Sequence, residues 1–88
     1  MMDKQTQQFF DRWNEHCMAD FLFMRSQSGI DWFRELRRLA ADIPVDNWRE
    51  YALWLAEETQ KAVDNDDANR IIKLSMNAFD NQMRLIWA

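Results

Sequence analysis

Gly29 and Pro44 are the only glycine and the only proline in a chain of 88 residues. Tight hairpin turns use glycine for positive φ and proline for a fixed φ, so this chain has little means of joining short β-strands. Hydrophobic residues make up 48% of the chain and aromatic residues 14%, which is too rich in large apolar groups for a disordered protein. The sequence therefore predicts an all-α fold.

Apolar residues recur at spacings of three and four and predict four helices, over about residues 4–26, 31–42, 47–63 and 67–86. Ser26 to Gly29 is interpreted as the stop of the first helix, with Gly29 available for a left-handed residue. Asp46 is interpreted as the N-cap of the third helix, and Pro44 ends the second. Short connections favour antiparallel neighbours, so we expect one helical domain over residues 1–88, a small bundle.

The fourth predicted helix begins near Asp66 or Asp67, either of which is a good N-cap. Its expected buried stripe passes through Ala68, Ile71, Ile72, Ser75, Phe79, Met83 and Ile86, with Trp87 at the tip.

The residues that usually carry catalysis or bind metals are scarce. Cys17 and His16 are single, which excludes an intramolecular disulfide and a zinc site built from several cysteines or histidines. The segment DNDDANR, residues 64–70, fails the calcium-loop pattern at positions 5, 6 and 12, and capping aspartates explain it better. One glycine cannot make a glycine-rich phosphate loop. We therefore expect a non-enzymatic protein with no catalytic residue, metal or cofactor.

The charge is unevenly distributed along the chain, whose net charge is −4. Between residues 50 and 69, six acidic residues against Lys61 leave a balance of −5. These acids form a candidate acidic surface: Glu50, Glu57, Glu58, Asp64, Asp66 and Asp67. A nucleic-acid footprint is normally basic, so direct binding to nucleic acid is disfavoured.

The best basic cluster is RELRR, residues 34–38. Together with the Pro44 turn and the third predicted helix, it could imitate a helix-turn-helix. The recognition helix would then carry Glu50, Glu57 and Glu58, whose charge has the wrong sign for phosphates.

Apolar residues also extend around whole helices at FLFM (21–24), YALWLA (51–56) and LIWA (85–88). A domain of this size has little interior in which to surround a helix completely. Some of Phe23, Trp32, Trp54 and Trp87 should therefore be partly exposed and mark a partner surface. Alternatively, the tryptophans simply fill a small core. A homodimer would cover these faces economically, and a different protein would use the same chemistry.

The leading hypothesis is a small protein–protein interaction module, an adaptor or inhibitor that docks aromatic and arginine anchors on a partner. The expected anchors are Phe23, Trp32, Arg34, Arg37, Arg38, Trp54 and Trp87. In small size and missing catalytic set the chain is similar in type to the accessory proteins that phages and mobile elements direct against host machinery. The alternatives are an acidic nucleic-acid mimic that blocks a DNA- or RNA-binding protein, and a small helical DNA-binding regulator.

The longest apolar run is the six residues of YALWLA, far below the ~20 needed to cross a bilayer. The first residues are polar and charged where a signal peptide needs a continuous apolar run. The sequence therefore predicts a cytoplasmic protein without a membrane partner.

Overall fold

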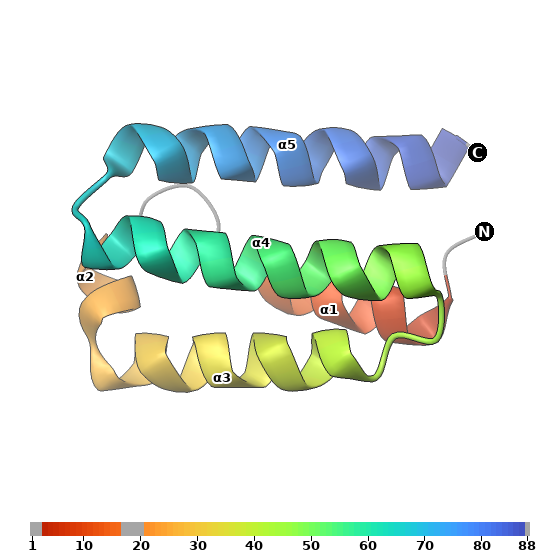
Figure 1. Ribbon diagram of the computed structural model, residues 1–88, viewed down its shortest axis with the longest axis horizontal. Helices are drawn as coiled ribbons and strands as arrows, with labels where there is room; N and C mark the ends of the chain where they lie inside the picture. The colour runs from red at the N-terminus through yellow and green to blue at the C-terminus, as the bar shows by residue number, and fades with distance from the viewer. Residues whose placement is uncertain (1–2, 17–20, 88) are drawn as a thin grey trace.

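The computed structural model describes residues 3–16 and 21–87, with residues 21 and 85–87 described in the backbone only. These residues form the helices α1 (Lys4–Asn14), α2 (Phe21–Arg25), α3 (Gln27–Ala41), α4 (Asp46–Asp64) and α5 (Ala68–Trp87). α3, α4 and α5 lie side by side and alternate in direction, while α1 lies behind α4 in the view of Figure 1. The predicted all-α fold, a small bundle with antiparallel neighbours, is confirmed.

The first predicted helix, residues 4–26, is wrong in extent. α1 ends at Asn14, and a turn follows at residues 15 and 16. α2 is a separate short helix that packs against α3 and α4. Within α2, Met24 is buried at 3% exposure, Phe23 is half-buried, and Leu22 is 87% exposed. The four apolar residues FLFM are thus not covered together; only part of this run enters the core.

α3 begins at Gln27, four residues before the predicted start. The Ser26 hydroxyl accepts a 3.2 Å hydrogen bond from the Gly29 amide and caps the helix. Gly29 lies inside α3 without a positive φ, so its predicted role as a helix stop is wrong. Its missing side chain serves packing, because a Cβ there would lie 2.6 Å from the Met24 carbonyl oxygen and closer still to that of Phe23.

The other predicted boundaries agree with the structure within a residue or so. The Asp67 carboxylate accepts a 3.0 Å hydrogen bond from the Arg70 amide at the start of α5, as a capping residue does. The prediction that Asp46 is the N-cap of α4 is wrong. Asp46 is the first residue of the helix, and the N-cap is Val45, whose side chain makes no capping hydrogen bond. The Asp46 carboxylate instead accepts a 2.6 Å hydrogen bond from Arg49.

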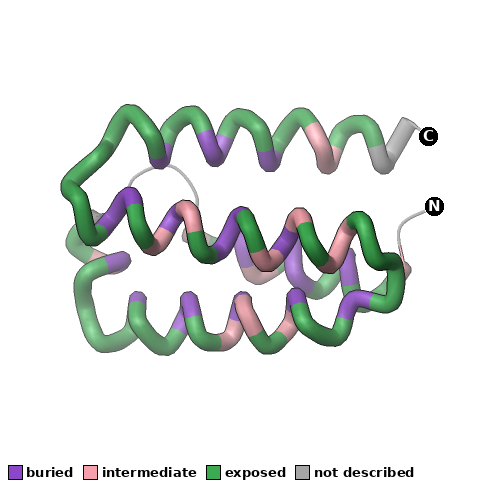
Figure 2. The backbone as a smooth tube through the Cα atoms, viewed as in Figure 1, coloured by how far each residue is buried: buried purple, intermediate pink, exposed green. Residues whose placement is uncertain are grey.

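The core lies where α3 packs on α1, α2 and α4. α5 packs mainly on α4, so only the side of α5 that faces α4 is buried (Figure 2). The largest side chains that the core hides almost completely are Trp13, Trp32, Phe9, Phe10, Phe33, Leu36, Ile43, Leu55, Ile71 and Leu74. α5 is therefore a helix at the edge of the bundle with one face left outside.

None of the helices within the described residues combines the length and the apolar character that spanning a bilayer requires. α5 has 20 residues, but charged side chains interrupt it at Arg70, Lys73, Asp80 and Arg84.

Candidate interaction surfaces

The four aromatic residues predicted to reach the surface have different environments. Trp54 is 39% exposed. Its ring lies near Tyr51 and under the Arg70 guanidinium, whose Cζ is 6.0 Å from the ring centroid. Phe23 is half-buried. Trp32 is only 2% exposed. The side chain of Trp87 lies outside the part of the chain that the structure describes. Of the described aromatic anchors, Trp54 is thus the most accessible to a partner.

Trp32 belongs to the core, which corrects its assignment as a partner-binding residue. Its ring stacks on Trp13 at a centroid distance of 5.9 Å and meets Phe33 edge to face at 4.9 Å. Its Nε1–H donates a 3.0 Å hydrogen bond to the Arg12 carbonyl oxygen. A buried indole needs such a partner for its only polar group. Trp32 therefore links α3 to the last turn of α1 through this hydrogen bond. Its side chain is too buried for a partner to contact it.

The predicted arginine cluster divides between two roles. The Arg37 guanidinium donates a hydrogen bond to Gln60 of α4 and is half-buried, so this residue links two helices of the bundle. Arg34 and Arg38 are exposed, and each has an acidic residue one turn earlier on α3, at 3.6 Å and 3.8 Å respectively. Exposed pairs of this kind contribute little stability. Arg34 and Arg38 thus remain accessible cations, although the carboxylates beside them reduce the positive field.

The acidic residues of the α4–α5 hairpin are all exposed except Glu58, which is half-buried. Two of them have structural roles: Asp67 caps α5, and Asp66 pairs with Arg25 of α2 in a turn where Asp66 has a φ of 57°. Glu50, Glu57 and Asp64 recur every seven residues and so share one face of α4. Among the described residues, no group of three acidic, histidine or cysteine side chains is placed to hold a metal.

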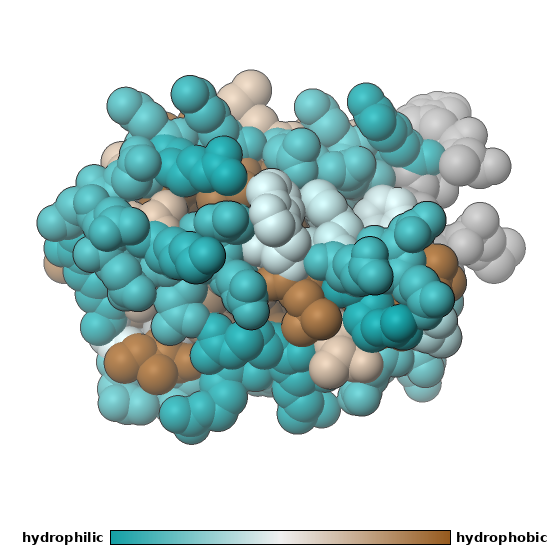
Figure 3. All heavy atoms as spheres, viewed as in Figure 1, coloured by the Kyte–Doolittle hydropathy of each residue, from teal (hydrophilic) through white to brown (hydrophobic). Residues whose placement is uncertain are grey.

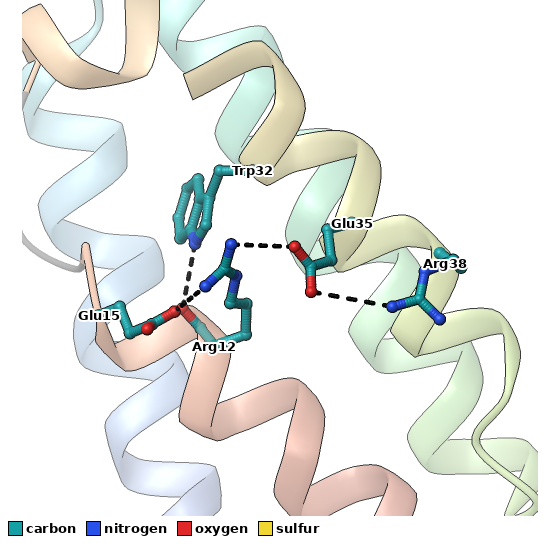
Figure 4. A network of polar contacts seen from close by, with 5 residues as sticks. All are labelled: Arg12, Glu15, Trp32, Glu35 and Arg38. Carbon is teal, nitrogen blue, oxygen red and sulfur yellow. Dashed lines mark hydrogen bonds and ion pairs between the residues drawn. The ribbon is translucent and has the colours of Figure 1, made fainter. Parts of the chain in front are cut away.

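A network of charged side chains joins α1 to α3 (Figure 4). The Arg12 guanidinium lies 2.8 Å from Glu15 and 2.9 Å from Glu35, and Glu35 reaches Arg38 at 3.8 Å. These residues line an open groove of about 430 Å³. Each carboxylate in the network faces an arginine. The network therefore links α1 to α3 through ion pairs.

Of the eight large hydrophobic side chains that are exposed among the described residues, four lie on α5, and three of these were expected in its buried stripe. Ile72 is 40% exposed, Met76 60%, Phe79 61% and Met83 36%. Their spacing of four, three and four residues puts them on one side of the helix, and we call this set the α5 stripe. The prediction that Ala68, Ile72, Phe79 and Met83 face the core is wrong, and the side chain of Ile86 lies outside the described residues. Ile71, Leu74, Ser75 and Ala78, on the neighbouring side, are buried instead.

A hollow of about 370 Å³ lies beside the α5 stripe, between α1 and α5. Trp13 lines it from α1, and Met76 and Phe79 line it from α5. At one margin Asn14 and Gln82 exchange side-chain hydrogen bonds of 2.9 Å and 3.3 Å, which connect the two helices. The stripe and the hollow together form a ridge beside a depression, a shape that can receive a side chain from another protein.

The face of the molecule seen in Figure 3 is mostly hydrophilic, with small and separate hydrophobic areas. The other exposed large hydrophobic residues, Leu22, Ile30, Val45 and Trp54, come one at a time from different elements. Scattered residues of this kind are ordinary on protein surfaces, whereas a continuous stripe is not.

Comparison with protein-family models, with curated protein sequences and with solved structures finds no match to this chain. Its interpretation therefore depends on the physical properties of the surfaces described above.

Proposed function

We propose that this chain is a non-enzymatic protein–protein interaction module that acts as an adaptor or inhibitor by docking on another protein. The single observation that carries the proposal is the α5 stripe of Ile72, Met76, Phe79 and Met83, which is exposed along about three turns of one helix. Continuous apolar surface on a small protein usually marks a protein interface, because water leaves it on association.

The way α5 is held supports this role. Ile71, Leu74 and Ala78 are buried and fix the helix to the bundle, so the stripe is presented by a rigid element. A partner that binds a rigid helix face loses little conformational entropy in ordering it. Residues at spacings of three and four on one helix face are the anchors that helix-in-groove recognition uses.

The exposed charges outside the stripe suit the orientation of a partner more than the strength of its binding. Arg34 and Arg38 lie on α3, and Glu50 and Glu57 lie on α4 beside the exposed Trp54. We therefore assign the main docking role to the α5 stripe and a steering role to these charges. Phe79 and Met76 are the central anchors, whereas Trp32 is buried in the core and takes no part in docking.

The test is a pull-down of the tagged protein from nuclease-treated cell lysate, with captured proteins identified by mass spectrometry. Phe79→Ser and Met76→Ser should abolish capture of any specific partner. Leu22→Ser is the matched control, because Leu22 is 87% exposed but lies on α2, away from the stripe. Circular dichroism confirms that each variant is folded. Capture that survives both α5 substitutions would refute the proposed docking surface.

A second candidate function is the acidic nucleic-acid mimic. The observation that favours it is the row of Glu50, Glu57 and Asp64, all exposed on one face of α4. Such a mimic would bind a basic protein with an affinity that falls steeply as salt rises. Partner binding that is insensitive to salt but sensitive to Phe79→Ser would favour the first function.

A further inference from the structure

We infer that the α5 stripe binds the α5 stripe of a second copy of this chain, with the two helices antiparallel about a two-fold axis. This inference rests on the proposed function, because it names the partner of the same face. It is carried by two features of α5 that agree on one register: the spacing of the apolar residues and the positions of two unpaired charges.

The charges are Lys73 and Asp80, which lie two turns apart on one flank of the stripe. Both are exposed, and neither forms an ion pair within the part of the chain that the structure describes. Seven residues separate them by about 10 Å along the helix, which is too far for them to pair with each other. A second copy can supply the missing partners.

A two-fold axis perpendicular to two antiparallel helices brings the same flank of each helix together. If the axis passes between Met76 and Asn77, Lys73 lies level with Asp80 of the partner subunit, and Asp80 lies level with the partner's Lys73. Two equivalent ion pairs then form. A parallel pair would instead place the flank that carries Lys73 and Asp80 against the opposite flank of the partner's stripe, so Lys73 and Asp80 would not meet across the seam.

The same register interleaves the apolar side chains. Counting residues from the axis, Phe79 of the partner subunit lies level with Leu74, midway between Ile72 and Met76. The partner's Ile72 lies level with Asn81, midway between Phe79 and Met83. Stripe residues from the two copies thus alternate about every two residues, or about 3 Å, along the seam. Alternation of this kind lets side chains of facing helices fill the gaps between one another.

The hollow beside the stripe fits this arrangement. Met76 of the partner subunit lies level with Asn77, within the span of α5 that lines the hollow from Ser75 to Gln82. A methionine side chain is flexible and fills irregular apolar spaces well. A depression and a protruding side chain on the same patch are complementary to each other under two-fold symmetry, as an isologous interface requires.

Two further cations of α5, Arg70 and Arg84, lie near the two ends of the seam. Arg70 and the partner's Arg84 differ by one residue in level. The Arg70 guanidinium lies over the Trp54 ring of its own chain, 6.0 Å from the centroid, and so points toward α4. Both side chains are exposed, where solvent and salt screen their repulsion.

The experiment measures the mass of the purified full chain by analytical ultracentrifugation over a range of concentrations. We expect a species of twice the 10.7 kDa chain mass, which dissociates on dilution. Lys73→Glu and Asp80→Lys should each weaken the dimer about tenfold, because each replaces two attractive pairs by two repulsive ones. Mixing the two variants should restore association, because each ion pair then regains opposite charges.

Lys61→Glu is the matched control, a charge reversal of an exposed lysine on α4 outside the seam, and it should leave the dimer unchanged. Failure of the mixture to associate better than either variant alone would overturn the antiparallel register. A chain that stays monomeric while Phe79 is needed to capture a different protein would overturn this inference and leave the proposed function standing. A monomer that captures nothing through Phe79 would overturn both.

Discussion

Ala78 and Phe79 are neighbours in α5, yet Ala78 is fully buried while Phe79 leaves 61% of its surface exposed. The boundary between the core and the outside therefore passes between consecutive residues. Because the side chains of consecutive helical residues point about 100° apart, the whole helix divides in the same way. One side fixes α5 to the bundle, and the adjacent apolar side remains available to another protein.

Substitutions on the two sides of α5 should have different effects on stability. Leu74 is 1% exposed, so Leu74→Ala should lower the free energy of unfolding by about 2–4 kcal/mol through lost burial and a cavity. Phe79→Ala should lower it by less than about 1 kcal/mol, because the ring is already largely in water. Urea denaturation in dilute solution measures both values. Equal costs would mean that Phe79 belongs to the core.

The hydrogen bond from Trp32 to Arg12 should contribute measurably to the packing of α3 on α1. Trp32→Phe keeps an aromatic ring but removes the Nε1–H donor and part of the buried volume. We expect the free energy of unfolding to fall by about 1–3 kcal/mol. Trp54→Phe, made at an exposed position, should change it by no more than about 0.5 kcal/mol. Thermal or urea unfolding followed by circular dichroism would show whether the two tryptophans differ in this way.

Gly29→Ala should destabilise the fold, although alanine is normally the better helix former by about 1 kcal/mol. The added Cβ would clash with the backbone carbonyl oxygens of Phe23 and Met24, which cannot move without displacing α2. We expect a net loss of about 1–3 kcal/mol in urea denaturation. Ser28→Ala, at the exposed preceding residue, is the control. A stabilised Gly29→Ala variant would show that α2 does not approach α3 so closely.

Asp3 is the N-cap of α1, and its carboxylate should make the stability of the fold depend on pH. Burial acts to raise the pKa of Asp3, but hydrogen bonds from the Thr6 hydroxyl and amide outweigh it and lower that pKa below its usual 3.8. A carboxyl with a lowered pKa stabilises the fold above its unfolded pKa, and this contribution is lost as the pH falls through the folded pKa.

Asp3→Ala should therefore cost about 1 kcal/mol near neutral pH, and the difference from the unchanged protein should shrink below about pH 4. Asp3→Asn retains a neutral capping side chain, so its stability should lack this pH dependence. Urea denaturation of the three proteins between pH 3 and 7 checks the expectation, using about the range over which an aspartate titrates. A difference that is constant across this range would contradict the capping role.

The helix pattern and most boundaries were accessible from the sequence, because single residues determine them. Asp67 caps α5 and Pro44 follows the end of α3, as predicted. The break after Asn14 was not accessible, since apolar spacing continues through this region and gives no sign that the chain turns. Asp46 and Gly29 were misassigned because capping and close packing depend on neighbours that only the folded chain brings together.

The candidate site was harder to predict, because α5 carries two apolar faces side by side. Ile71, Leu74 and Ala78 form one, and Met76 and Phe79 belong to the other. Both satisfy helical periodicity, and only the edge position of α5 decides that one of them is buried. α3 shows the opposite case: three helices pack on it, so Trp32 is buried although it was among the residues expected at the surface.

The most direct test of the α5 interface is photo-crosslinking in living cells from residue 79, with p-benzoylphenylalanine in place of Phe79. The same photoreactive residue at position 22, which is more exposed, serves as the control. We predict one discrete crosslinked product from residue 79 and none from residue 22, with a mass of two chains if the partner is a second copy. Absence of a specific product from residue 79 would contradict the claim that the α5 stripe binds a protein.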